Sequence, residues 1–334
     1  MAAAALKANP APAMVQTDQL AVLCKALADN LRLKILRLLK SESFGVLELC
    51  HILDIKQSLL SHHLKILSTA DLLTTRREGN SIFYRRLLLV ISDPFLSIKR
   101  SLFDNIDCLP LPDDQLKRIR FVHLERSRLS LSFFNRNADK FREKQGLITE
   151  YTHYAKNLLD LLDALALDTG KTAMEVGPGE GELLAQLATQ FERVIAVDNS
   201  KEMLERAKNC IASAQRTNVQ FILGDTTVAK KKNRSDLLIF NMVLHHISSP
   251  AKTFKEASEI LNPGGTLLIV DLCPHDQDWV RESCGDIWLG FDENDLCLWA
   301  EKANLSVDQS SYLGLRNGFQ IQMRLFSKSA QLAP

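Results

Sequence analysis

The sequence of 334 residues lacks any run of about 18 uncharged apolar residues, so none of its segments is predicted to cross a bilayer as a helix. Its seven cysteines are scattered and include no Cys-X-X-Cys pair. This spacing argues against zinc-finger and iron–sulfur sites and favours reduced thiols in a cytoplasmic protein. With 46% hydrophobic and 24% charged residues, the composition also excludes a mostly disordered or collagen-like chain.

The N-terminal segment also lacks the features of a secretory signal. Residues 1–14 are rich in Ala and Pro, Lys7 is their only charge, and no long apolar stretch follows it. We interpret residues 1–14 as a disordered tail.

The overall charge of +1 conceals an asymmetry between the two halves of the chain. Residues 1–150 contain 23 Lys and Arg against 16 Asp and Glu, whereas residues 151–334 contain 18 against 24. The length suggests two domains. A basic first half joined to an acidic second half indicates an anion-binding module fused to a different domain.

The basic half begins with a pattern of short helices. Apolar residues recur at helical spacing from Thr17 to Leu27 and again over 31–40. A short helix over 46–53 is followed by a tight turn and a second helix that begins near Ser58, a favourable N-cap residue. The inner face of this second helix is rich in leucine and its outer face is small, polar and basic. This arrangement is typical of a helix–turn–helix.

Two β-prone runs follow the helices, on either side of Glu78-Gly79-Asn80. Gly and Asn favour a tight turn, so residues 72–87 predict a β-hairpin. Between Lys56 and Arg86 there are six Lys and Arg against two Asp and Glu. A basic hairpin beside a helix–turn–helix is a wing suited to gripping DNA phosphates.

The stretch from about residue 15 to 105 resembles the arsenic-repressor (ArsR/SmtB) family of winged-helix regulators. The resemblance rests on ALADNLRLKILRLL, the ELC at 48–50, QSLLSHHLKIL and REGNSIFY. It implies an α+β winged helix–turn–helix domain that binds a palindromic double-stranded DNA operator as a homodimer. The positions implied to contact the major groove are Gln57, Ser58, Ser61 and His62, and those implied to contact phosphate are Lys65 and Arg77.

Metal sensing, which some members of that family perform, is not expected here. Those sensors carry a Cys-X-Cys pair directly after Glu-Leu, whereas Glu48-Leu49 is followed by Cys50 and His51. One thiolate beside a histidine cannot fill a three-thiolate metalloid site, and a free cysteine is more often a small core residue. We therefore predict no bound metal.

A connecting region separates the two halves. Residues 87–105 predict an apolar helix suited to dimer formation. Residues 106–146 predict a linker and a connecting helix, because a Pro- and Asp-containing stretch at 108–115 precedes a basic, helix-compatible segment. From Lys171 onward, strands alternate with helices, which predicts an α/β doubly wound parallel sheet with helices on both faces. Ligands of such sheets bind at the carboxyl ends of the strands.

The first of these strands ends in the turn Glu175-Val176-Gly177-Pro178-Gly179-Glu180-Gly181. Glycines let a backbone turn sharply and approach a bound group closely. A nicotinamide fingerprint needs its third glycine at the position of Glu182, and an acid at a helix start disfavours a pyrophosphate. A cationic sulfonium with an amino group fits better.

Carboxylates at the next strand ends complete the expected nucleoside site. Asp198 lies 21 residues after Gly177 and can accept both ribose hydroxyls. Gly224-Asp225 can bind the exocyclic amine of an adenine, and Met203 can pack against the adenine face.

The segment from about 147 to 275 resembles class I S-adenosylmethionine (SAM)-dependent methyltransferases, nearest to the ubiquinone/menaquinone type. The resemblance rests on EVGPGEG, VIAVDNSKEML, the GD pair, NMVLHHI and LNPGGTLLIVD. It implies a Rossmann-like domain over 147–328, including a C-terminal extension, that binds SAM or S-adenosylhomocysteine (SAH). The ligand-binding residues implied are Glu175, Gly177, Gly179, Gly181, Asp198, Met203, Gly224, Asp225 and Asn241.

Methyl transfer itself requires alignment, desolvation and, for some acceptors, a base. His245 and His246 are the candidate bases, because they lie just past the fourth strand and histidine titrates near neutrality; a packed or capping histidine is the alternative. Two functions stay open. One is a DNA-binding regulator that responds to SAM or SAH. The other is an active methyltransferase of a small-molecule acceptor, with the winged helix serving autoregulation.

Overall fold

The computed structural model describes residues 16–168, 170–231 and 233–330. The predicted disordered tail of residues 1–14 lies outside the described residues. The described chain divides into two compact units. The first runs to Arg77 and includes Ser81–Leu116, and the second comprises Glu78–Asn80 and the chain from Lys117 onward. The main division falls within helix α6 (Asp113–Asn137).

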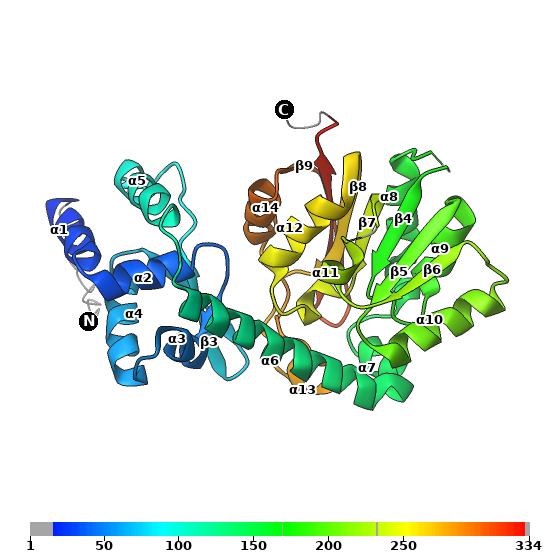
Figure 1. The fold of residues 1–334 in the computed structure, drawn as a ribbon, viewed down its shortest axis with the longest axis horizontal. Helices are drawn as coiled ribbons and strands as arrows, with labels where there is room; N and C mark the ends of the chain where they lie inside the picture. Colours follow the sequence, from blue (N-terminus) through cyan, green and yellow to red (C-terminus); the bar gives the residue numbers. More distant parts are fainter. Residues whose placement is uncertain (1–15, 169, 232, 331–334) are drawn as a thin grey trace, which may run out of the picture. The chain divides into compact units, whose positions relative to one another are not determined.

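The first unit consists of short helices and a small sheet (Figure 1). Its elements are α1 (Gln16–Leu27), α2 (Asn30–Leu38), β1 (Phe44–Gly45), α3 (Val46–Leu53), α4 (Gln57–Thr69), β2 (Leu73–Glu78), β3 (Ser81–Arg86) and α5 (Leu96–Asp107). The strand order is β1-β3-β2. Strands β2 and β3 are joined at Gly79, whose φ of 62° favours glycine. The predicted hairpin is confirmed.

Helices α3 and α4 form the predicted helix–turn–helix. On α4, Leu60, Leu64 and Leu67 are each at most 1% exposed, because they recur at helical spacing on one face. The expected cap at Ser58 was wrong. The helix begins one residue earlier, and Lys56 occupies the N-cap position without a side-chain capping bond.

The helix expected over 87–105 begins later, at Leu96. Pro94 disfavours helical geometry in the residue before it. Asp93 then fixes the start of the helix, because its carboxylate accepts hydrogen bonds from the Phe95 N–H and from Lys99 Nζ, both at 2.8 Å. Residues 87–95 are therefore not helical.

The second unit contains the connecting helices and a larger α/β domain (Figure 1). Its helices are the C-terminal part of α6, η1 (Ala138–Lys140), α7 (Phe141–Gly146), α8 (Tyr151–Ala164), α9 (Glu182–Gln190), α10 (Lys201–Ser213), α11 (Thr226–Ala229), η2 (Leu244–His246), α12 (Pro250–Ile260), α13 (Trp279–Ser283) and α14 (Glu293–Lys302). Its strands are β4 (Thr172–Val176), β5 (Arg193–Asp198), β6 (Val219–Leu223), β7 (Ser235–Asn241), β8 (Leu261–Leu272), β9 (Leu305–Gly314) and β10 (Gln320–Lys328).

The strands form one sheet in the order β6-β5-β4-β7-β8-β10-β9. Strands β4 to β8 pair in parallel, whereas β10 runs antiparallel to both β8 and β9. The sheet is thus mostly parallel, with an antiparallel pair at one edge. Most residues of the edge strand β9 are polar and exposed, so the sequence carries no apolar pattern that would predict this strand.

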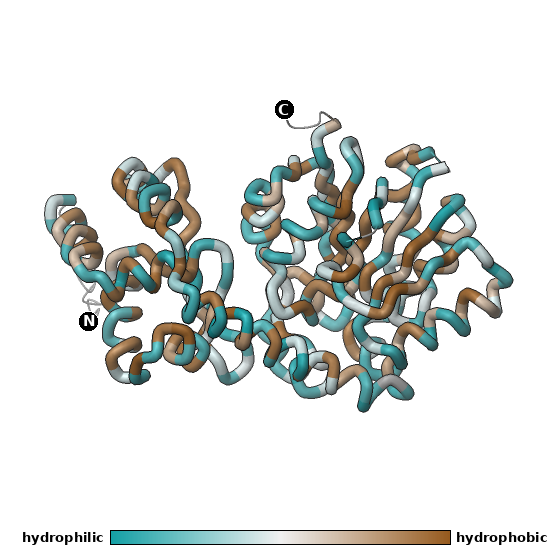
Figure 2. The backbone as a smooth tube through the Cα atoms, viewed as in Figure 1, coloured by the Kyte–Doolittle hydropathy of each residue, from teal (hydrophilic) through white to brown (hydrophobic). Residues whose placement is uncertain are grey.

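Both faces of the sheet are covered. On β7, Leu237 and Ile239 belong to the same apolar cluster as residues of α8, α9 and α10. Their neighbours Leu238 and Phe240 point to the opposite face and are also fully buried. The hydrophobic colouring concentrates along the central strands (Figure 2). Among the described helices, none has the length and hydropathy required to span a membrane.

Candidate functional site

A glycine-rich turn connects β4 to α9. Gly177, Gly179 and Gly181 all have positive φ, at 68°, 57° and 88°, which favours glycine. A Cβ atom on Gly177 would lie 2.4 Å from Cγ2 of Val243. The Gly177 N–H donates to the Val197 carbonyl oxygen at 2.8 Å. The turn is therefore fixed against the ends of the neighbouring strands.

A cavity of about 440 Å³ opens beside this turn, at the carboxyl ends of β4 to β7. This is the edge at which doubly wound sheets bind ligands. The predicted site residues that line the cavity are Gly177, Gly179, Asp198, Met203, Gly224, Asp225 and His246. Those that do not line it are Glu175, Gly181, Asn241 and His245.

Asp198 is the acidic group at the end of β5. Its Oδ1 accepts a hydrogen bond from the Ser200 N–H at 2.8 Å. Burial raises the pKa of Asp198 to about 6, although the N–H groups of Ser200 and Asn199 oppose the shift. The carboxyl group is therefore ionised at neutral pH and can accept hydrogen bonds from a ligand.

Asp225 has a structural role as well as a place on the cavity wall. Its side chain accepts a hydrogen bond from the Val228 N–H at 3.1 Å and caps α11. Met203 is 3% exposed and contributes an apolar surface to the same cavity.

A second cavity of about 100 Å³ also borders the glycine turn. Gly177, Gly179 and Asn241 line it, and the Asn241 Oδ1 accepts a hydrogen bond from the Tyr154 hydroxyl at 3.1 Å. Glu175 is fully buried and lines neither cavity, and burial raises its pKa to about 8. Gly181 lines neither cavity and occupies the N-cap of α9.

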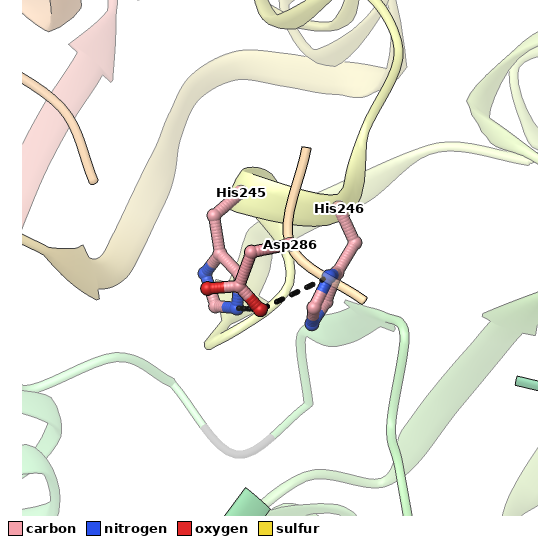
Figure 3. Close-up of side chains that lie close together, drawn as sticks. All are labelled: His245, His246 and Asp286. Atoms are coloured by element: carbon pink, nitrogen blue, oxygen red, sulfur yellow. Dashed lines mark ion pairs between the residues drawn. The ribbon is translucent and has the colours of Figure 1, made fainter. Parts of the chain in front are cut away.

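The histidine pair occupies η2 (Figure 3). His245 is fully buried, and its Nδ1 lies 2.7 Å from Asp271 Oδ1. Burial acts to lower the pKa of His245, but the carboxylates of Asp271 and Asp286 outweigh it and raise the pKa to about 9. His246 lines the larger cavity and contacts the Phe134 ring edge-on, with ring centroids 4.7 Å apart. Burial and the neighbouring His245 lower the pKa of His246 well below its ordinary value.

Several contributors to the site were not predicted. Phe134 and Phe141 line the larger cavity from α6 and α7, far from the strand ends in sequence. Asp286 faces the histidine pair from the C-terminal extension. None of these residues belongs to a local motif, so only the tertiary structure brings them to the site.

The residues predicted to contact DNA lie at the surface of the first unit. Gln57, Ser58, Ser61, His62 and Lys65 are exposed on one face of α4, and Arg77 is exposed on β2. Cys50 is half-buried on α3, and burial raises the pKa of its thiol.

Two protein-family descriptions match the chain. Residues 167–309 match "Methyltransferase domain", and residues 29–75 match "Bacterial regulatory protein, arsR family". The expected fold class is therefore confirmed: a winged helix–turn–helix domain precedes a Rossmann-like methyltransferase domain.

Sequence relatives cover only part of the chain. A 37.1 kDa protein in transposon TN4556 of Streptomyces fradiae is 34% identical over 113 residues, which are 33% of this chain and 32% of that protein. The methyltransferase Mb0092 of Mycobacterium bovis is 32% identical over 111 residues, which are 33% of this chain and 55% of that protein. The chain thus spans between a third and about half of the length of these relatives.

Solved structures share the fold of the second unit. The magnesium protoporphyrin IX methyltransferase of Synechocystis PCC 6803, solved with bound SAH, aligns with a TM-score of 0.51 and 16% identity. The alignment covers 61% of this chain and 100% of that chain. At this identity the likeness shows the fold alone.

Proposed function

Because the chain joins an arsR-family helix–turn–helix domain to a methyltransferase domain, we propose that it is a DNA-binding transcriptional regulator whose operator affinity responds to SAM or SAH. One observation carries the ligand assignment. The glycine turn and the ionised Asp198 line a single cavity at the carboxyl edge of the parallel sheet. As part of this proposal, the protein is a cytoplasmic homodimer.

In the proposed complex, the larger cavity holds the adenosine group. The Asp198 carboxylate accepts hydrogen bonds from the ribose hydroxyls. Met203 packs against the adenine ring. The methionine end of the ligand lies toward the smaller cavity, because Gly177 and Gly179 line both cavities. Asn241 lines that smaller cavity, beside Tyr154.

The DNA side of the proposal rests on α4 and the wing. Exposed polar side chains on α4 are suited to the edges of bases in the major groove. Lys65 and Arg77 are suited to phosphate contacts, which fix the position of the protein on DNA. A dimer would place two such surfaces on a palindromic operator.

The proposal is tested by measuring how ligand binding in the cavity changes the affinity of the protein for DNA. Duplex DNA selected by the protein from a random pool is titrated with protein alone, with SAM and with SAH. We expect one ligand to change the operator affinity at least about tenfold, a coupling of about 1.4 kcal/mol. Equal affinities in all three titrations, with ligand binding verified by calorimetry, would contradict the regulatory proposal.

Replacing Arg77 by Ala tests the wing. We expect weaker binding to every duplex alike and a salt dependence whose slope decreases by about 1, because one phosphate contact is lost. Fluorescence anisotropy at several salt concentrations measures both quantities. Arg216→Ala, which removes an exposed arginine of the methyltransferase domain, serves as the control. An unchanged slope in the Arg77 variant would show that Arg77 does not contact DNA phosphate.

Methyl transfer to a small-molecule acceptor is a second candidate, favoured by one observation. His246 and Phe134 line the same cavity as Asp198, so an acceptor could lie beside the ligand's sulfonium. His245 does not line the cavity, so of the two histidines only His246 is placed to touch an acceptor there. This function would be favoured over the first if SAM did not change the operator affinity and the protein produced SAH in the presence of an acceptor.

A further inference from the structure

The side chains of His245, His246 and Asp286 converge at the end of η2 (Figure 3). One possible ligand atom from each lies within 4.8 Å of the others. The Oδ1 atom of Asp286 is 4.0 Å from His245 Nε2 and 3.8 Å from His246 Nδ1. The side chains are 0%, 5% and 0% exposed for His245, His246 and Asp286, respectively. Three groups that can donate lone pairs are thus gathered away from water.

Several polar atoms of these three side chains lack a hydrogen-bond partner. Within the described part of the chain, His245 Nε2, His246 Nε2 and both carboxylate oxygens of Asp286 are buried without a hydrogen bond. Buried polar groups almost always have a partner, so several orphaned atoms in one cluster call for an explanation. A cation among them would satisfy the imidazole lone pairs and the carboxylate together.

Asp271, behind the cluster, orients the ring of His245 as a metal ligand requires. Asp271 Oδ1 lies 2.7 Å from His245 Nδ1, and Asp271 also accepts the Leu272 N–H at 2.7 Å. A carboxylate that holds one imidazole nitrogen leaves the lone pair on the other nitrogen, as is usual for metal-binding histidines. The nitrogen of His246 that faces Asp286 is Nδ1, which also lies 3.2 Å from the Gly285 carbonyl oxygen. Binding a metal ion through Nδ1 would therefore replace this hydrogen bond.

We propose that His245, His246 and Asp286 bind a divalent transition-metal ion with the ligand preference of Zn²⁺. Two imidazoles and one carboxylate make up a set that binds zinc in catalytic sites and leaves a further coordination position open. Mg²⁺ and Ca²⁺ prefer ligand sets made of oxygen atoms. The prediction of no bound metal was based on the cysteine pattern around Cys50. It did not consider Asp286, which lies far along the chain from the histidine pair.

The proposed ion would act on a small molecule bound in the larger cavity. His246 lines that cavity, so a ligand atom of a small molecule bound there can occupy the open position. A metal ion in such a position polarises a bound oxygen and lowers its pKa. His246 would then be a metal ligand, and the bound oxygen, not an imidazole, would be the group that is activated.

Metal titration of the full-length protein tests the proposal without SAM or DNA. Protein stripped with a chelator is titrated with Zn²⁺ against a chromophoric competitor, and Co²⁺ serves as a spectroscopic probe of nitrogen and oxygen ligands. We expect His246→Ala and Asp286→Ala each to lose one equivalent of tightly bound metal. Asp271→Asn should weaken that site about 10–100-fold, because it orients a ligand without touching the ion. His153→Ala, at an exposed histidine, should bind like the wild type.

Thermal melting of each metal-free variant verifies the fold, and Asp286→Asn replaces Asp286→Ala if the latter unfolds. Equal stoichiometry and affinity in the wild type and the cluster variants would overturn the proposal, since the metal would then be bound elsewhere. Absence of any tight site in the wild type would also overturn it and leave the cluster as a hydrogen-bonding and ion-pair network. Neither outcome bears on SAM binding, so the two proposals fail separately.

Discussion

Asp198→Ala is expected to weaken the binding of SAM and SAH by about a hundredfold or more. Hydrogen bonds to a charged group contribute about 1.5–3 kcal/mol each, and the variant removes those to both ribose hydroxyls. Because the pKa of Asp198 is about 6, the wild-type carboxylate is ionised in titrations performed well above that pH. Isothermal titration calorimetry measures the loss directly.

Two further variants make this result interpretable. Asp198→Asn keeps the size of the side chain and an oxygen for the Ser200 N–H, so it separates the loss of charge from local unfolding. Asp160→Ala removes an exposed carboxylate on α8 and should bind the ligands normally. Operator binding without ligand should persist in every variant. Wild-type ligand affinity in Asp198→Ala would contradict the proposed site, and simultaneous loss of DNA binding would contradict the independence of the domains.

Gly177→Ala is expected to abolish most ligand binding as well, for a steric reason. Its Cβ would lie 2.4 Å from Val243 Cγ2, and the φ of 68° disfavours any residue with a Cβ. The left-handed conformation alone costs about 1–2 kcal/mol. Relief of the contact must move the glycine turn or the chain before η2, and both border the cavity. Calorimetry with SAH and a thermal melt measure the two effects.

Gly314→Ala is the matched control, because no atom lies within 4 Å of the Cβ that it would add. Val243→Ala removes the closest atom of the contact, so the double variant Gly177→Ala/Val243→Ala should recover part of the affinity. Unchanged binding in Gly177→Ala would show that the turn does not border the ligand. Equal losses in both glycine variants would show that the effect is not specific to the turn.

Local patterns predicted most of the architecture. The leucine spacing of α4, the Gly79 turn and the alternation of strands and helices each depend on neighbours in sequence, so the chain alone reveals them. The glycine turn and Asp198 were predicted for the same reason, since each lies at the carboxyl end of a strand.

The sequence could not determine which side chains of a motif reach the cavity. Val176 lines the larger cavity, while its neighbour Glu175 points to the other face of the sheet. Likewise, His246 lines the cavity, whereas His245 is fully buried and does not line it. Contributions from Phe134 and Asp286 depend on long-range packing, for which one sequence carries no local signal.

The position of β10 has a consequence for synthesis of the protein on the ribosome. Although β10 is the last strand along the described chain, it lies between β8 and β9 in the sheet. Until residues 320–328 emerge, one edge of β8 keeps its main-chain hydrogen-bonding groups unpaired. Such pairing across a long sequence separation is slow, and unpaired strand edges promote aggregation. The nascent α/β domain therefore completes its sheet only when nearly all of its chain has left the exit tunnel.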